Sequence, residues 1–170
     1  MIANSMSHIA RGSNGAMFFQ WRQSISGSEK FHSAMFPHAG RKSRIWRSVV
    51  ELGKQIHDLG NLSKTQTQRA QVAMIFDYES WWALSQMNLP STSISYPELA
   101  HDWYRALWEL GVRVDFVSPN SLLEDLNAYE LVLAPMQYLM SDSQEQVLSN
   151  YVANGKNLIS SYFTGISNED

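Results

Sequence analysis

Short apolar runs alternate with longer helical patterns over the second two-thirds of the chain. Runs rich in β-branched and aromatic residues predict strands at 72–76, 112–117, 131–135 and 158–163. Residues 97–110 and 141–154 have apolar positions at helical spacing, and a glycine follows each stretch. Because strands and helices alternate at this spacing, the sequence predicts an α/β fold with an open, mostly parallel sheet of the flavodoxin-like kind.

The first sixty residues follow a different pattern, in which one predicted strand lies between two predicted helices. The helices are expected at 3–11 and 43–60, and the strand, which should be buried, at 16–21. A single parallel strand leaves hydrogen-bonding groups unpaired at both edges and needs cover on both faces. We therefore interpret this part as the closing unit of a larger barrel whose other units precede Met1.

A polar stretch without an apolar period, residues 61–71, separates the two patterns. It predicts a linker and places a domain boundary near residue 65. We therefore expect two domains, residues 1–64 and residues 65–170.

Composition narrows the classes of function. Hydrophobic residues make up 44% of the chain, and the net charge of -3 gives no electrostatic basis for binding nucleic acid or a membrane surface. No run approaches the roughly 18 apolar residues of a membrane-spanning helix. Zero cysteines exclude disulfides, thiolate metal sites and thiol nucleophiles. Residues 1–11 lack the features of a secretion signal. This favours a cytoplasmic location weakly, and only if the chain begins where its gene begins.

The densest site chemistry follows the strand predicted at 16–21. An amide, an indole, a guanidinium, a carboxylate and an imidazole occur close together, at Gln20, Trp21, Arg22, Glu29 and His32. Such a set suits a neutral, hydroxyl-rich ligand better than a phosphate or an apolar one. Glu29 and His32 stand three apart, so on a helical turn both side chains would point the same way and could hold sugar hydroxyls.

Four of these residues, Glu29, His32, Trp21 and Arg22, also have a purely structural interpretation. Glu29 and His32 could be a helix cap and a partly exposed histidine, and a metal site would need a second carboxylate–histidine pair that this sequence does not offer. Trp21 could fill a core instead of stacking on a ligand ring, and Arg22 could pair with Glu29. His38, beside a proline, is expected to be a structural loop residue.

The turn after the first strand of the second domain, residues 77–82, is bulky and acidic. In flavodoxin-like proteins this position often cradles phosphate between small residues, whereas here a phosphate would meet Asp77 and Glu79. Nucleotide and flavin binding are therefore disfavoured, and no cofactor is expected. The adjacent Trp81 and Trp82 are predicted to pack against a neighbouring domain or another subunit.

Several long motifs in one order resemble a known family. In the first part they lie at residues 11–15 (Arg11-Gly12-Ser13-Asn14-Gly15), 18–22, 29–35 and 37–40. In the second part they lie at residues 76–83 (Phe76-Asp77-Tyr78-Glu79-Ser80-Trp81-Trp82-Ala83), 104–108, 114–117 and 131–135. Together they resemble the end of the catalytic barrel of the glycoside hydrolase family 42 β-galactosidases, followed by that family's trimerisation domain. The resemblance covers nearly the whole chain.

The resemblance implies a retaining glycosidase with a (β/α)8 barrel, a flavodoxin-like trimerisation domain and a small final β-domain, assembled as a homotrimer. It assigns Glu29 and His32 to hydroxyls of the galactosyl unit in the −1 subsite, with Trp21 and Gln20 as further candidates. Retaining hydrolysis needs two carboxylates roughly 5–5.5 Å apart. In this family both lie on earlier barrel strands, upstream of this chain.

The resemblance therefore implies that this chain is a fragment. Residues 1–64 would be the last strand–helix unit of the barrel, and residues 65–170 a trimerisation domain truncated at its C-terminal end. Such a fragment would lack both catalytic glutamates and would be inactive alone. Some members of the family carry a cysteine-ligated zinc, to which a segment without cysteine contributes nothing.

Two other hypotheses stay open. The chain could be a non-catalytic α/β assembly module that acts only in subunit contact. A flavodoxin-like redox or nucleotide-binding protein fits the loop at 77–82 less well. The hypotheses differ in the partners they imply. A β-galactosidase would bind a β-galactoside and two further copies of the chain, an assembly module would bind another subunit alone, and a flavodoxin-like protein would bind a flavin.

Overall fold

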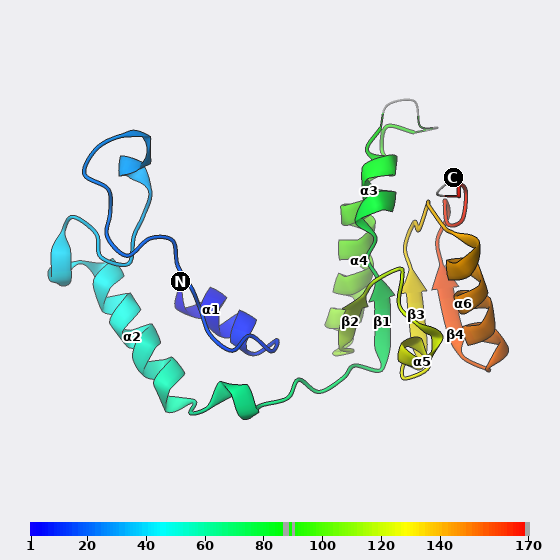
Figure 1. Cartoon of the computed structure of the whole chain (residues 1–170), viewed down its shortest axis with the longest axis horizontal. Helices are drawn as coiled ribbons and strands as arrows, with labels where there is room; N and C mark the ends of the chain where they lie inside the picture. The colour runs from blue at the N-terminus through cyan, green and yellow to red at the C-terminus, as the bar shows by residue number, and fades with distance from the viewer. Residues whose placement is uncertain (87–88, 90, 169–170) are drawn as a thin grey trace. The chain divides into compact units, whose positions relative to one another are not determined.

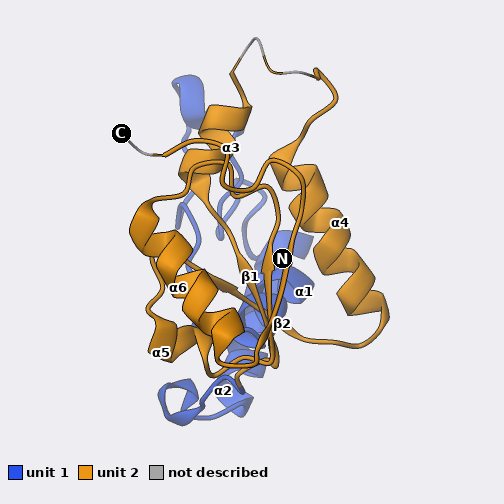
Figure 2. Cartoon of the chain, turned by 90° about the vertical axis from the view of Figure 1, so that its right-hand side faces the viewer, with its two compact units in different colours: residues 1–68 blue, residues 69–170 orange. Residues whose placement is uncertain are grey.

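The computed structural model describes residues 1–86, 89 and 91–168, and the chain forms two compact units (Figures 1 and 2). Unit 1 is Met1–Gln68 and unit 2 is Arg69–Asp170. The division lies close to the boundary expected near residue 65. No helix in the described part of the chain has the length and apolar character needed to cross a membrane.

Unit 1 is built from helices and loops. Its elements in chain order are α1 (Ile2–Ile9), η1 (Ser28–Phe31), η2 (Gly40–Lys42), α2 (Arg44–Asp58) and η3 (Leu62–Lys64). The helix predicted at 43–60 is confirmed as α2, and Ser43 caps it by accepting a hydrogen bond from Trp46 N at 3.1 Å. Gly12 has a φ of +101° and packs against Thr67, so a side chain there would be both strained and in collision.

The buried strand predicted at 16–21 is wrong for this chain. Residues 16–20 form no strand, and the described part of unit 1 contains a single parallel bridge, between Arg22 and Phe36. Met17 and Phe19 are 98% and 73% exposed. The reason is that a strand exists only where a neighbouring strand accepts and donates its backbone hydrogen bonds, and unit 1 supplies none beside this run.

Unit 2 is an α/β domain. Its elements are β1 (Val72–Ile75), α3 (Tyr78–Leu84), α4 (Tyr96–Glu109), β2 (Val114–Val117), α5 (Leu123–Leu126), β3 (Leu131–Ala134), α6 (Asp142–Ala153) and β4 (Asn157–Ser160). The sheet order is β2-β1-β3-β4 and every neighbouring pair is parallel. The predicted parallel α/β sheet is therefore confirmed: β1, β2 and β3 lie within the ranges expected for them, and β4 overlaps its expected range but begins one residue earlier and ends at Ser160.

Two helices escaped the sequence analysis. Residues 77–82, interpreted as a loop, contain the start of α3, and α5 had no counterpart among the expected elements. Asp77 caps α3 by accepting a hydrogen bond from Glu79 N at 3.0 Å. Both helices are too short to show a full apolar period, which explains why the pattern did not reveal them.

The core of unit 2 lies on both faces of the sheet, and Figure 2 shows α4 on one side and α5 with α6 on the other. Alternate residues of β1 face opposite ways: Val72 and Met74 pack with Ala100 of α4, whereas Ala73 and Ile75 join the other cluster. A strand covered on both faces has no polar side, so β1 reads as an unbroken apolar run.

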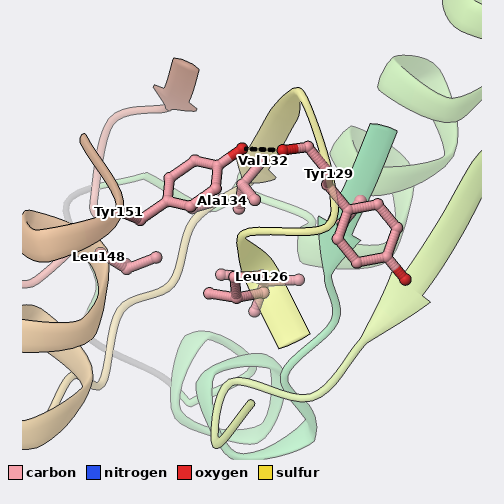
Figure 3. Close-up of a cluster of buried hydrophobic side chains, with 8 residues drawn as sticks. Leu126, Tyr129, Val132, Ala134, Leu148 and Tyr151 are labelled. Atoms are coloured by element: carbon pink, nitrogen blue, oxygen red, sulfur yellow. Dashed lines mark hydrogen bonds between the residues drawn. The ribbon is translucent and has the colours of Figure 1, made fainter. Parts of the chain in front are cut away.

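The cluster on the α5–α6 side contains two buried tyrosines (Figure 3). Tyr151 is fully buried and its hydroxyl donates to the carbonyl oxygen of Tyr129 at 3.1 Å. The hydroxyl of Tyr129 points the other way and donates to Asp115 Oδ2 at 3.3 Å. Each ring thus fills the core while its polar end keeps a partner, which avoids the cost of an unpaired buried hydroxyl.

Candidate functional site

The segment expected to carry the site folds back on itself in unit 1. Met35 N donates to Gln20 O at 3.0 Å, Phe36 N to Trp21 O at 2.7 Å, and Gln23 N to Phe36 O at 3.2 Å. These bonds hold residues 20–23 beside residues 35–36. The intervening residues form a projecting loop, and this loop carries Glu29 and His32.

An aromatic cluster fixes the base of the loop. The rings of Trp21 and Phe36 stack with centroids 6.4 Å apart, and Trp46 of α2 meets both edge-on, at 5.7 and 5.1 Å. Trp21 remains 59% exposed, so it packs on one side and presents its other side to solvent. The two interpretations of Trp21, packing and ligand stacking, are thus compatible in geometry.

Arg22 and His38 also contact residues at the base of this loop. The guanidinium of Arg22 lies 5.7 Å from the centre of the Phe36 ring, and it forms no ion pair with Glu29 among the described residues, so that interpretation is wrong. His38 Nε2 lies 3.3 Å from Gln23 O, and His38 N donates to Gln23 Oε1 at 3.1 Å. His38 therefore holds the loop base, as a structural histidine should.

Glu29 and His32 belong to one tight turn. Glu29 lies in η1, and His32 follows its end, with His32 N donating to Glu29 O at 2.9 Å. Both residues are exposed, and the His32 ring meets Phe19 edge-on at 6.5 Å. A carboxylate that accepts and an imidazole that can donate or accept are therefore open to a ligand from the same turn.

Gln20 has a polar atom in need of a partner. Its Oε1 accepts a hydrogen bond from Ser24 Oγ at 3.4 Å, but its Nε2 is buried and makes no hydrogen bond within the part of the chain described. Buried amide groups are nearly always paired. Gln20 is thus a donor placed for an acceptor outside these residues.

The four candidates do not line the pocket that neighbouring residues of unit 1 form. A pocket of about 240 Å³ opens beside Phe18 and Phe19 and extends to Ser33 and Met35, but neither Glu29 nor His32 lines it. In the described part of the chain, no group of three or more histidines and carboxylates is close enough to hold a metal ion.

Unit 2 contains a buried polar network that was not predicted from the sequence. Asp77 is 4% exposed and accepts a hydrogen bond from Ser80 Oγ at 2.5 Å, while Ser80 Oγ accepts one from Leu139 N at 3.0 Å. The network joins the residues after β1 to those after β3. In parallel α/β sheets the crevice between these two strand ends is the usual ligand site, and here the protein's own side chains fill it.

A second feature of unit 2 also escaped the sequence analysis. A pocket of about 700 Å³ lies at the carboxyl ends of β1 and β2, and its lining consists of residues 76–79 and 116–120. The sequence signal was present in part, because both stretches directly follow predicted strands. That the two strands are neighbours was not readable from the sequence.

Comparison with known proteins gives matches over almost the entire chain. Residues 70–170 match the family model described as β-galactosidase trimerisation domain, and residues 1–59 match the model described as β-galactosidase. A β-galactosidase of Arthrobacter sp. is 42% identical over 169 residues, which are 99% of this chain and 24% of that protein. A β-galactosidase of Geobacillus kaustophilus is 42% identical over 167 residues, or 98% of this chain and 24% of that protein.

Solved structures give the same picture. The β-galactosidase from Bacillus circulans sp. alkalophilus is 33% identical, with a TM-score of 0.89 over 97% of this chain and 24% of that one. The β-galactosidase from Rahnella sp. R3 is 35% identical, with a TM-score of 0.89 over 99% of this chain and 24% of that one. This chain therefore spans about a quarter of the length of these relatives.

Proposed function

Because this chain belongs to the glycoside hydrolase family 42 β-galactosidases, and its larger unit to their trimerisation domain, we propose that it is part of a retaining β-galactosidase. The substrates would be terminal, non-reducing β-D-galactose residues. In this proposal residues 1–64 are the last strand–helix unit of the (β/α)8 catalytic barrel, and residues 65–170 are a flavodoxin-like trimerisation domain. The observation that carries the proposal is the match of residues 1–59 to the β-galactosidase model, followed after ten residues by the match of 70–170 to the trimerisation-domain model.

The exposed apolar segment of unit 1 supports the barrel assignment. Met17 and Phe19 lie in solvent at 98% and 73% exposure, and Gln20 Nε2 lacks an acceptor among the described residues. Barrel strands pair on both sides, so adjoining strands would complete the backbone hydrogen bonds of this run, and the barrel interior and outer helices would cover its side chains. An apolar run left in water is otherwise unfavourable, by about 25 cal/mol for each Å².

In the complete enzyme Glu29 and His32 bind hydroxyls of the galactosyl unit in the −1 subsite. Their exposure and their origin in one turn support this role, and Gln20 and Trp21 are further substrate contacts. The carboxylate of Glu29 accepts from sugar hydroxyls, and such charge-assisted hydrogen bonds are stronger than neutral ones. They accelerate hydrolysis only as far as they strengthen in the transition state.

Bond cleavage itself is assigned to other parts of the enzyme. A retaining mechanism uses one carboxylic acid to protonate the leaving oxygen and a second carboxylate, roughly 5–5.5 Å away, as nucleophile. We place both upstream of this chain. The chain by itself then has no hydrolase activity and contributes sugar positioning and subunit contact.

Replacing Glu29 by Gln in the complete enzyme tests the substrate role. The amide keeps the shape but loses the charge, so we expect kcat/KM for a nitrophenyl β-galactoside to fall by roughly 30-fold or more, corresponding to about 2 kcal/mol. Glu51→Gln is the matched control, since Glu51 is an exposed carboxylate on α2. An unchanged kcat/KM in Glu29→Gln refutes the assignment.

The second candidate, a pure assembly module, is favoured by the trimerisation-domain match of unit 2. We propose a homotrimer of the complete protein, with unit 2 providing subunit contacts. Sedimentation of the complete protein measures the number of subunits. A trimer without activity toward any β-galactoside supports the assembly module over the enzyme.

A further inference from the structure

The pocket at the carboxyl ends of β1 and β2 has no part in the function proposed above. It measures about 700 Å³, within the usual range for small-molecule sites, and all its lining residues belong to unit 2. The neighbouring crevice, between the ends of β1 and β3, is closed by Asp77 and Ser80. The pocket lies beside this closed crevice and is open.

One wall of the pocket is a rigid aromatic platform. The Phe76 ring meets the rings of Tyr78 and Phe116 edge-on, with centroids 5.2 and 6.1 Å away. Tyr78 also stacks on Trp81 at 5.9 Å, and Phe116 stacks on Tyr104 at 5.6 Å. Tyr78 and Phe116 are nevertheless 57% and 53% exposed. Because the rings behind them hold both in place, a ligand could stack there at little cost in side-chain entropy.

The other wall supplies groups that bind hydroxyls. Glu79, Ser118 and Asn120 line the pocket and are exposed. Asn120 is fixed in position, since its Oδ1 accepts from Gln144 Nε2 at 2.8 Å and its N donates to Ser118 Oγ at 3.1 Å. A carboxylate, a hydroxyl and an amide together offer acceptors and donors around the aromatic wall.

Charge selects the class of ligand. Asp77 and Glu79 are the charged residues of the lining, and none of its described residues is Lys, Arg or His. Glu79 is exposed, whereas the Asp77 carboxylate is buried and accepts hydrogen bonds from Glu79 N and Ser80 Oγ. Phosphates and other anions would therefore be repelled, and a purely apolar ligand would leave Glu79 without a hydrogen bond. A neutral sugar has apolar C–H faces for the rings and hydroxyls for the polar wall, so it satisfies both.

We propose that this pocket binds a neutral saccharide of one to three units, at a site separate from the barrel. The choice of a galactoside as the probe rests on the proposed function, whereas the pocket's preference for neutral sugars does not. Such a site would keep an oligosaccharide substrate or product bound to the enzyme outside its catalytic site.

Calorimetric titration of the complete protein with thiodigalactoside, which is neutral and resists hydrolysis, tests the proposal. We expect two binding events per subunit. Tyr78→Ala and Glu79→Gln should each weaken one event at least 10-fold while leaving kcat/KM for a nitrophenyl β-galactoside unchanged. Tyr162→Ala is the control, since Tyr162 is a 59% exposed aromatic residue beyond β4 that does not line the pocket, and it should retain both events.

The outcomes separate this site from the barrel site. The proposal is overturned if titration shows one binding event per subunit and neither pocket variant weakens it. It is also overturned if Glu79→Gln changes the sedimentation coefficient, because the pocket would then be a subunit interface. A protein without hydrolase activity that loses its single event in the pocket variants supports this site while contradicting the proposed function. Glu79→Gln is conservative and exposed, so it keeps the test valid should Tyr78→Ala fail to fold.

Discussion

At the scale of single residues, the best-defined chemistry of this chain is the buried polar group after β1. Asp77, Ser80 and Tyr96 are 4%, 0% and 2% exposed. The hydroxyl oxygen of Tyr96 accepts from Asp77 N at 2.7 Å, and Ser80 links Asp77 to Leu139 N. Every member has a partner, which is the condition under which buried polar groups stabilise a fold.

Burial raises the pKa of Tyr96 to about 12, because the phenolate would be removed from water. An unfolded tyrosine loses its proton near pH 10. Between pH 10 and 12 the folded state therefore binds more protons than the unfolded state, and stability falls as pH rises, by at most roughly 1 kcal/mol per pH unit from this residue. Below pH 10 the residue adds no pH dependence.

Denaturant unfolding of the chain between pH 9 and 12, followed by backbone circular dichroism, tests this assignment. Tyr96→Phe should flatten the decline in the free energy of unfolding. A remainder should persist, because burial also raises the pKa of Tyr129 and of Tyr151. Tyr162→Phe, at an exposed tyrosine, is the control and should keep the full decline. A Tyr96→Phe curve parallel to the wild-type curve contradicts the prediction.

At the scale of elements, the predictions that rested on local sequence signals were reliable, whereas a strand that depends on pairing with a distant segment was predicted wrongly. The helix expected at 141–154 is α6, and Ser141 caps it: Ser141 Oγ accepts from Gln144 N at 3.3 Å, and Gln144 Oε1 accepts from Ser141 N at 3.0 Å. This capping box involves four consecutive residues and is therefore readable from the sequence. The strand expected at 16–21 could form only beside a neighbouring strand from another part of the sequence. The short helix α3 depends on packing against distant residues, which the local sequence does not reveal.

Removing the cap should destabilise unit 2 by about 1 kcal/mol, because Ser141→Ala leaves Gln144 N without its acceptor. Thermal or denaturant unfolding of the chain measures the change. Ser149→Ala, at an exposed serine within the same helix, should have little effect. Equal losses in both variants would contradict the role of the cap, because alanine has a higher helix propensity than serine and Ser149→Ala should not destabilise the helix by itself.

At the scale of the whole molecule, the two units differ in their cores. The buried hydrophobic side chains of unit 1 are Ala34, Leu52 and Leu62, whereas unit 2 has three clusters of buried residues among those described. Hydrophobic burial is the main stabilising term in folding. We therefore expect unit 2 to fold independently, and unit 1 to need contacts with other parts of the complete protein for its stability.

Hydrogen exchange measures this difference directly. In the isolated chain, amides of β1 and β3 should be protected, while those of α2 exchange at nearly unfolded rates. In the complete enzyme, which is the control, α2 should gain protection because adjoining barrel units bury its apolar face. Protection of α2 in the isolated chain equal to that of β1 would contradict both the expectation and the barrel assignment.

The candidate site was predictable only in part, for the same reason. Glu29, His32, Trp21 and Gln20 were identified from residue types close together in the sequence, and η1 indeed places Glu29 and His32 on one turn. The pocket between β1 and β2 was not predicted, because its two walls are about forty residues apart and meet only through strand pairing.

The amino-acid sequence by itself determined the parallel α/β class of unit 2, the approximate positions of its strands, and the helices α2, α4 and α6. These features depend on apolar period and on contacts within a few residues. The tertiary structure alone decided the strand order β2-β1-β3-β4, the closure of the crevice by Asp77 and Ser80, and the absence of a strand at 16–20. Each of these depends on which distant segment supplies a hydrogen-bonding edge, and that information is not local.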